Sequence, residues 1–129
     1  MADRTPKPLD ERTRALLDRI EARLPAGALR EAAMFGTRAV MLDEVMVAAV
    51  RKDHSMLVRV DGLDDAALMS RDEASRPEMG AGRSMGVGWI QVDAAALEDD
   101  GVLDLWMSHA RARFERHAAD PRPPSAHRR

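Results

Sequence analysis

The stretch that decides the fold is MFGTRAVMLDEVMVAAVRKDHSMLVRV, residues 34–60. It holds three short apolar runs rich in β-branched residues, separated by the polar steps Asp43-Glu44 and Lys52-Asp53-His54-Ser55. Each run is too short for a typical helix, whereas short apolar runs divided by polar steps are typical of strands. The stretch therefore predicts a tight antiparallel meander of three strands.

Two residues of this stretch need a separate explanation. Gly36 interrupts an extended run, which indicates a bulge or a close approach of backbone. In the last run, alternation places Arg59 on the face opposite Val58 and Val60. Because a charge on a central strand is costly to bury without a partner, Arg59 is interpreted either as half of an ion pair or as a contact for an anion or a partner molecule.

The sequence on both sides of the meander predicts elements that cover it. Apolar residues recur at helical spacing from Leu9 to Leu24 and from about Val102 to His117. A short helix capped by an acid is expected from Asp64 to Met69, and a further strand from Trp89 to Val92. The prediction is an α+β fold, in which an antiparallel sheet (the three-stranded meander plus a further strand) is flanked by an N-terminal and a long C-terminal helix.

Composition predicts one domain. Of the 129 residues, 1–8 are expected to form a flexible leader, 9–118 the domain and 119–129 a disordered basic tail. The chain has no cysteine, so disulfides and thiolate chemistry are excluded. Its amino terminus lacks the apolar core of a secretion signal, and no run has the length of a membrane helix. We expect a soluble, cytoplasmic protein.

The charge is unevenly distributed. Residues 1–110 carry 14 Lys and Arg against 20 Asp and Glu, whereas residues 111–129 carry six arginines against two acids. An acidic body disfavours general nucleic-acid binding. The basic residues of the end have two interpretations: a solvated helix face, or a weak patch for nucleic acid or an acidic partner. They are Arg111, Arg113, Arg116, Arg122, Arg128 and Arg129.

No catalytic constellation is evident in the sequence. The four histidines lack the spacing that places two imidazoles on one helical face. The glycine pattern of residues 80–86 is one residue too long for a dinucleotide fingerprint and precedes a strand, which favours a structural loop. Neither Ser55 nor Ser84 has an evident histidine to activate it, and the acids Asp64-Asp65 and Asp99-Asp100 are expected to cap helices. We expect no catalytic residue, no cofactor and no metal.

Five segments together resemble the TfoX amino-terminal domain family, which is related to the competence regulator TfoX (Sxy). They are Met34-Phe35-Gly36, the strand-turn-strand to Met46, Leu57-Val58-Arg59-Val60, Arg76-Pro77-Glu78-Met79-Gly80 and Gly88-Trp89-Ile90-Gln91-Val92. Their order and spacing match over roughly residues 9–117. The resemblance implies a small α+β domain and a bacterial, competence-related or transcription-related role. The family usually has glycine where this chain has Thr37, and it favours glycine in the hairpin turn occupied here by Asp43-Glu44.

These observations lead to a non-enzymatic regulatory or protein-interaction domain with an unidentified protein partner. The contact surface is expected at the sheet end near Met34, Phe35 and Gly36, together with Arg59, Arg83 and Trp89. Weak nucleic-acid binding through the arginine-rich end is the alternative. An enzyme that uses the glycine loop is a third hypothesis, and it requires a pocket beside Arg83 and Trp89. A homodimer formed by edge-strand pairing is also compatible with the sequence.

Overall fold

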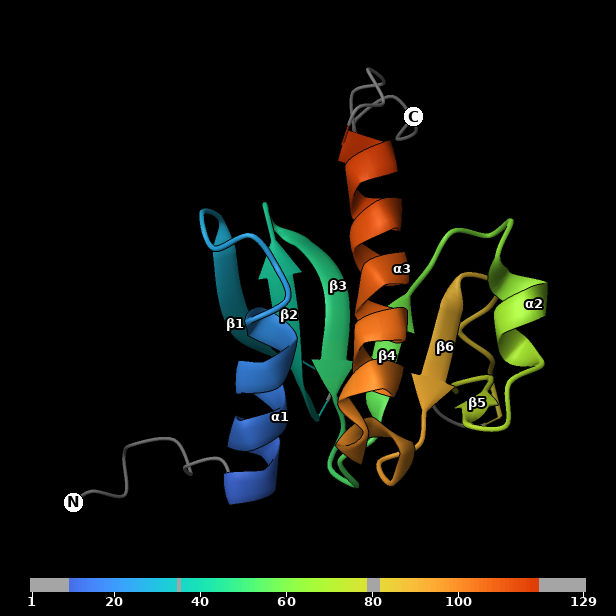
Figure 1. Cartoon of the computed structure of the whole chain (residues 1–129), viewed down its shortest axis with the longest axis horizontal. Coiled ribbons are helices and arrows are strands. Elements are labelled where there is room, and N and C mark those ends of the chain that lie inside the picture. The colour runs from blue at the N-terminus through green and yellow to red at the C-terminus, as the bar shows by residue number, and fades with distance from the viewer. Residues whose placement is uncertain (1–9, 35, 79–81, 119–129) are drawn as a thin grey trace.

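The computed structural model describes residues 10–34, 36–78 and 82–118, which form an antiparallel sheet with helices packed on it (Figure 1). Its strands are β1 (Leu29–Met34), β2 (Thr37–Leu42), β3 (Val45–Val50), β4 (Met56–Arg59), β5 (Ala74–Ser75) and β6 (Trp89–Val92). The helices are α1 (Glu11–Glu21), α2 (Asp65–Met69) and α3 (Asp100–Ala118), with a short 3-10 helix, η2 (Ala96–Glu98). The predicted α+β class, with its N-terminal and long C-terminal helices, is confirmed. The proposed leader and tail lie outside the described residues.

The sheet is larger than the sequence predicted: the described residues form six strands in the order β1-β2-β3-β4-β6-β5, where a meander of three strands and one more were expected. β1 pairs with β2 along its whole length, from Leu29 opposite Leu42 to Met34 opposite Thr37. Its alanines and its glutamate have weak strand propensity, so pairing with β2 decides its conformation. Gly36, with φ of +75°, therefore belongs to the turn between β1 and β2 and not to a bulge. The register of the sheet shifts elsewhere, between Val40 and Met41, where β2 pairs with β3.

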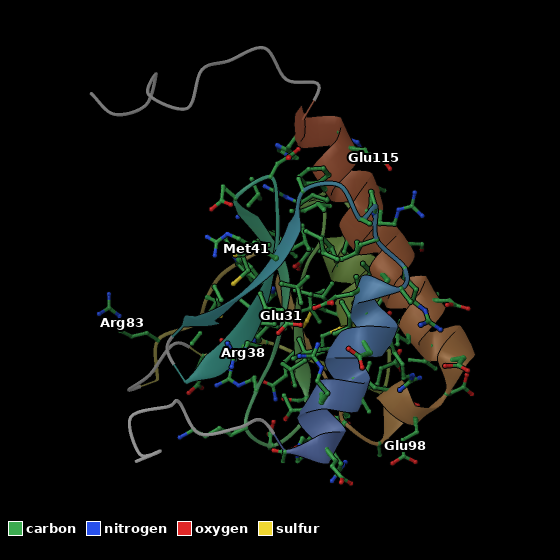
Figure 2. All side chains as sticks on the ribbon, turned by 90° about the vertical axis from the view of Figure 1, so that its left-hand side faces the viewer. Glu31, Arg38, Met41, Arg83, Glu98 and Glu115 are labelled. Carbon is green, nitrogen blue, oxygen red and sulfur yellow. The ribbon has the colours of Figure 1, made fainter. Side chains whose placement is uncertain are left out.

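The two faces of the sheet bury different sets of side chains. Figure 1 shows α1 and α3 on the same face, where they enclose the larger core. At its centre, Trp106 of α3 is 0% exposed and donates its indole N–H to Glu73 at 3.0 Å. The opposite face carries a smaller apolar cluster, and Figure 2 shows Met41 on this side, away from the helices. Its members are Ala39, Met41, Ala49 and Leu57, with Ala32, Met46, Met85 and Trp89 partly buried against them.

Acidic residues cap two of the three α-helices in the described part of the chain. The Asp10 carboxylate accepts a hydrogen bond from the backbone of Thr13 at 2.8 Å, at the start of α1. Asp99 accepts one from Gly101 at 2.7 Å, at the start of α3, as predicted. At α2 the cap prediction is wrong, because Asp64 makes no side-chain cap bond there and Asp65 is buried in a different interaction.

The turn between β2 and β3 is held in an unusual conformation. Asp43 and Glu44 have φ values of 51° and 65°, in the left-handed region that L side chains rarely adopt. A two-residue hairpin turn of this kind favours glycine or asparagine. Here Arg30 of the neighbouring strand binds Glu44 through Nε at 2.8 Å and Nη2 at 2.6 Å, which helps to hold the turn.

A charged cluster joins α1 to β1. Arg14 of α1 binds both carboxylate oxygens of Glu31, and its Nη2 lies 3.8 Å from the Oε2 of Glu21. That Oε2 is buried and makes no hydrogen bond within the described part of the chain. Burial and the neighbouring Glu31 carboxylate raise the pKa of Glu21 to about 7, above its ordinary value of 4.5. Arg14 holds the pKa of Glu31 below its ordinary value.

Replacing Glu21 with glutamine is expected to remove a pH dependence of stability. A raised carboxyl pKa favours folding below the unfolded value of 4.5, and that contribution is lost as the pH rises through the folded value of about 7. Glutamine is uncharged, so E21Q should raise the free energy of unfolding at pH 8 by about 1–2 kcal/mol and change it little at pH 5. Urea denaturation at both pH values measures this effect. The same substitution at exposed Glu11 is the control, and an unchanged wild-type pH dependence in E21Q would contradict the prediction.

Candidate interaction site

The guanidinium of Arg59 lies over the indole ring of Trp89 at the end of the sheet. The two residues are register partners at the last pair between β4 and β6, and the Arg59 carbon Cζ is 5.2 Å from the ring centroid. This is the distance of a cation–π contact. Within the described residues Arg59 has no ion pair or hydrogen bond, so the expected carboxylate partner is absent there. Burial lowers the pKa of Arg59.

A buried ion pair fixes the loop that precedes Trp89. Arg76 donates to both carboxylate oxygens of Asp65, at 2.6 and 2.9 Å, and to the carbonyl oxygens of Gly86 and Trp89, at 3.0 and 2.9 Å. The N–H of Gly88 donates to the same carboxylate at 2.8 Å. Asp65 is only 4% exposed, and Arg76 holds its pKa below the ordinary value. One carboxylate therefore joins α2, the segment after β5 and the start of β6.

Gly88 completes this arrangement for a steric reason. Its φ is +97°, and a Cβ at this position would meet the backbone oxygen of Val60 at 3.3 Å. The carbonyl oxygen of Gly88 accepts a hydrogen bond from the N–H of Val60 at 2.8 Å. The ends of β4 and β6 are thus held together just beyond the Arg59–Trp89 pair.

One face of α3 runs along the segment that leaves β4. His109, Arg113 and Arg116 have the spacing of a single helical face. The Nδ1 of His109 lies 3.7 Å from the Oδ2 of Asp64, and Arg116 binds the Oδ2 of Asp61. Arg113 lies between these contacts and, within the described residues, forms no ion pair. Burial lowers its pKa, the charge of Arg59 lowers it further, and the charge of Asp61 raises it.

The structure places the predicted contact residues at different parts of the sheet. The register puts Met34 and Gly36 at the end that contains Val50 and Met56, whereas Arg59 and Trp89 lie at the other end. Phe35 lies outside the described residues. Arg83 projects from its loop on the side of the sheet opposite the helices (Figure 2). Of the six predicted residues, Arg59 and Trp89 are therefore the pair that the structure brings into contact.

The arginines of the proposed nucleic-acid surface are not equivalent. Arg111 forms an ion pair with Glu115 at 3.4 Å, and Arg116 is paired with Asp61. Arg113 is partly buried. Arg122, Arg128 and Arg129 lie outside the described residues. Two of the three described arginines thus have carboxylate partners. The nucleic-acid hypothesis stays a prediction.

The described side chains give no indication of a metal site or of an activated serine nucleophile. Across residues 10–34, 36–78 and 82–118, no group of three or more His, Asp or Glu side chains is arranged to hold a metal ion. Ser55 donates to Asp53 at 2.6 Å, and the Ser84 hydroxyl accepts from the N–H of Gly86 at 3.0 Å. Met85 of the glycine-rich loop packs against the sheet. None of the described helices is long and apolar enough to cross a bilayer.

Sequence reasoning missed Asp65, Arg76 and Gly88 as the residues that organise this end of the sheet. Asp65 was interpreted as a helix cap, because acids at helix starts usually have that role. One sequence feature could have indicated a role for Arg76. It belongs to the segment Arg76-Pro77-Glu78-Met79-Gly80, which carries the family resemblance. Nothing local to either residue indicates that the two form a pair.

The fold and the site together define a class: a small α+β domain with an antiparallel sheet, in which buried charges hold loops in place. Within that class, the chain belongs to the TfoX N-terminal domain family, whose sequence model matches residues 22–113. The matched range begins just after α1, ends at Arg113 and contains all the strands of the described residues. Comparisons with curated proteins and with solved structures gave no significant match.

Proposed function

We propose that this chain is a non-enzymatic regulatory domain that acts by binding another protein in the cytoplasm, in a competence-related or transcription-related role. Membership of the TfoX N-terminal domain family supports the regulatory role. The observation that carries the binding role is Arg59, a half-buried guanidinium on a central strand that has no carboxylate partner in the described chain.

The physical reason is the cost of burying an arginine. Removing a guanidinium from water is unfavourable unless hydrogen bonds or an opposite charge replace the water. The Trp89 ring supplies part of that replacement, because a cation over an indole face is attracted by its quadrupole. The N–H donors of Arg59 remain available. A partner protein that offers hydrogen-bond acceptors would take the place of the water that the guanidinium has lost.

Replacing Arg59 with alanine is expected to abolish the capture of a specific partner. The tagged full chain would be used in a crosslinking pull-down from the cell that naturally expresses it, followed by mass spectrometry. Arg30→Ala is the matched control, because Arg30 is an exposed strand arginine already paired with Glu44. R30A should retain the proteins that R59A loses. Recovery of no specific protein by wild type, or of the same proteins by R59A, would refute the proposed function.

A further inference from the structure

Strand β1 forms an open edge of the sheet. In the described part of the chain it is the outermost strand, and it pairs only with β2. Figure 1 shows β1 at the border of the molecule, and in Figure 2, which faces this border, the helices lie to one side of the strand. Such an edge is a template on which a further strand can pair.

The pairing with β2 decides which backbone groups of β1 point outward. The N–H of Asp43 donates to the carbonyl oxygen of Ala28 at 3.1 Å, one residue before the strand begins. Bonded and non-bonded pairs alternate in an antiparallel ladder, so Ala32 bonds to β2, whereas Glu31 and Ala33 direct their N–H and C=O groups away from it. No other backbone group of the described residues bonds to these outward groups.

β1 lacks the features that usually protect an edge strand, which are shortness, a bulge, a proline or unpaired charges. It has six residues in unbroken register with β2 and no proline. Its two charges are already neutralised within the chain, Arg30 by Glu44 and Glu31 by Arg14. The opposite edge, β5, is two residues long and is followed after one residue by Pro77. The sheet is therefore protected at one edge and open at the other.

The sequence of β1 is self-complementary when two copies pair antiparallel about Ala32. In that register Ala32 lies opposite its own copy, and Glu31 lies opposite Ala33 of the second copy. Each outward N–H of these two residues then meets an outward C=O. An axis at Glu31 or at Arg30 would place like charges directly opposite each other, which is destabilising. An axis at Ala33 would leave the groups of Glu31 beyond the end of the second strand.

A small residue is needed at the centre of such a pair. The backbone groups of Ala32 are directed to β2, so towards the second copy it would occupy a non-hydrogen-bonded position. At such positions the two Cα atoms approach to about 4.5 Å. The methyl groups of two alanines fit at this distance. A foreign strand would gain the same backbone bonds, but the match of small and charged positions about Ala32 is a match of the chain with itself.

We propose that β1 is an interface between two copies of this chain, which pair antiparallel about Ala32 and join their sheets into one. The arrangement is closed, because both copies use the same edge. An edge of six residues offers less surface than the roughly 1,200–2,000 Å² of a standard interface, so the dimer is expected to be weak and concentration-dependent. β2 and β3 separate β1 from β4, so the Arg59–Trp89 pair of each copy stays accessible.

Single cysteines test the register, because the chain has no cysteine of its own. Ala32→Cys should form a disulfide-linked dimer under mild oxidation, since a Cα separation of about 4.5 Å suits a disulfide. Ala33→Cys is the matched control. Ala33 is more exposed than Ala32, yet its two copies would lie about 8 Å apart, beyond the reach of a disulfide. Equal or better crosslinking of A33C would overturn the inference.

Sedimentation velocity of the full chain, from low micromolar to millimolar concentration, tests the dimer itself. The mass of the wild type should rise towards twice that of the monomer. Ala33→Pro removes an outward N–H and no bond to β2, and proline is tolerated where an edge N–H faces solvent. It should weaken the dimer about tenfold or more, because two hydrogen bonds are lost. Ala33→Ser keeps the N–H and should associate as the wild type does.

Amide spectra show whether β1 remains paired with β2 in each variant, and the cysteine comparison decides if A33P fails to fold. A wild type that stays monomeric at the highest concentration, or a folded A33P that dimerises like the wild type, would overturn the inference. Monomeric A33P should still capture the cellular partner that R59A loses. A failure of the dimer therefore leaves the proposed function standing, and the reverse also holds.

Discussion

The variant Asp65→Ala is expected to lose about 3–5 kcal/mol of the free energy of unfolding, the cost of removing one partner from a buried ion pair. Asp65 is 4% exposed and accepts three hydrogen bonds, two from Arg76 and one from the N–H of Gly88. Alanine would leave the Arg76 guanidinium, whose side chain is 28% exposed, without its counter-charge. Chemical denaturation followed by circular dichroism measures the loss.

Asp64→Ala is the matched control for this change. Asp64 is the adjacent acid, but its side chain is 45% exposed, and among the described residues its ion pair is with His109, at 3.7 Å. Its removal should change the free energy of unfolding by less than about 0.5 kcal/mol. A loss of similar size in both variants would show that the Asp65–Arg76 pair has no special role. D65A should also broaden the amide signals of residues 86–88, because their anchoring carboxylate is gone.

The variant Trp106→Ala is expected to be destabilised by about 3–5 kcal/mol through loss of a large buried side chain. The Trp106 side chain is 0% exposed and lies between α3 and the sheet. Its loss would open a cavity at the centre of the larger core and leave Glu73 without the indole donor. Thermal and urea denaturation measure the effect.

Two further variants separate the contributions of Trp106. Trp106→Phe keeps an aromatic ring but removes the N–H to Glu73, so a smaller loss of about 1–2 kcal/mol is expected. Exposed Ser108 on the same helix donates to the carbonyl oxygen of Leu105, and Ser108→Ala should stay within about 0.5 kcal/mol of wild type. An order other than W106A, W106F, S108A in decreasing loss would contradict this account of the core.

The fold was predictable where a pattern is local. The central runs from Thr37 to Arg59 alternate or are continuously apolar, and the structure has β2, β3 and β4 there. The helices α1 and α3 follow from 3.6-residue periodicity. β1 and β5 were missed, because β1 contains residues with weak strand propensity and β5 is two residues long. In both cases hydrogen bonding to a neighbouring strand sets the conformation.

The candidate site was predictable only in part. The strand pattern already placed the charge of Arg59 on a central strand, where it needs a partner. Trp89 was among the predicted contact residues. The expected grouping of Met34 and Gly36 with Arg59 was wrong, because the register places them at opposite ends of the sheet. Arg113 was predicted for another surface, and its partial burial depends on where α3 crosses the sheet.

The sequence by itself determined the α+β class, the two long helices, the central strands and the family, because these depend on periodicity and on motifs that each occupy a few neighbouring residues. Only the tertiary structure decided which charges meet. It buried Asp65 against Arg76, paired Asp61 with Arg116 and placed Arg59 over the ring of Trp89. The reason is physical: the energy of a charge depends on its solvation and its partners, and the backbone supplies those partners from segments far apart in the chain.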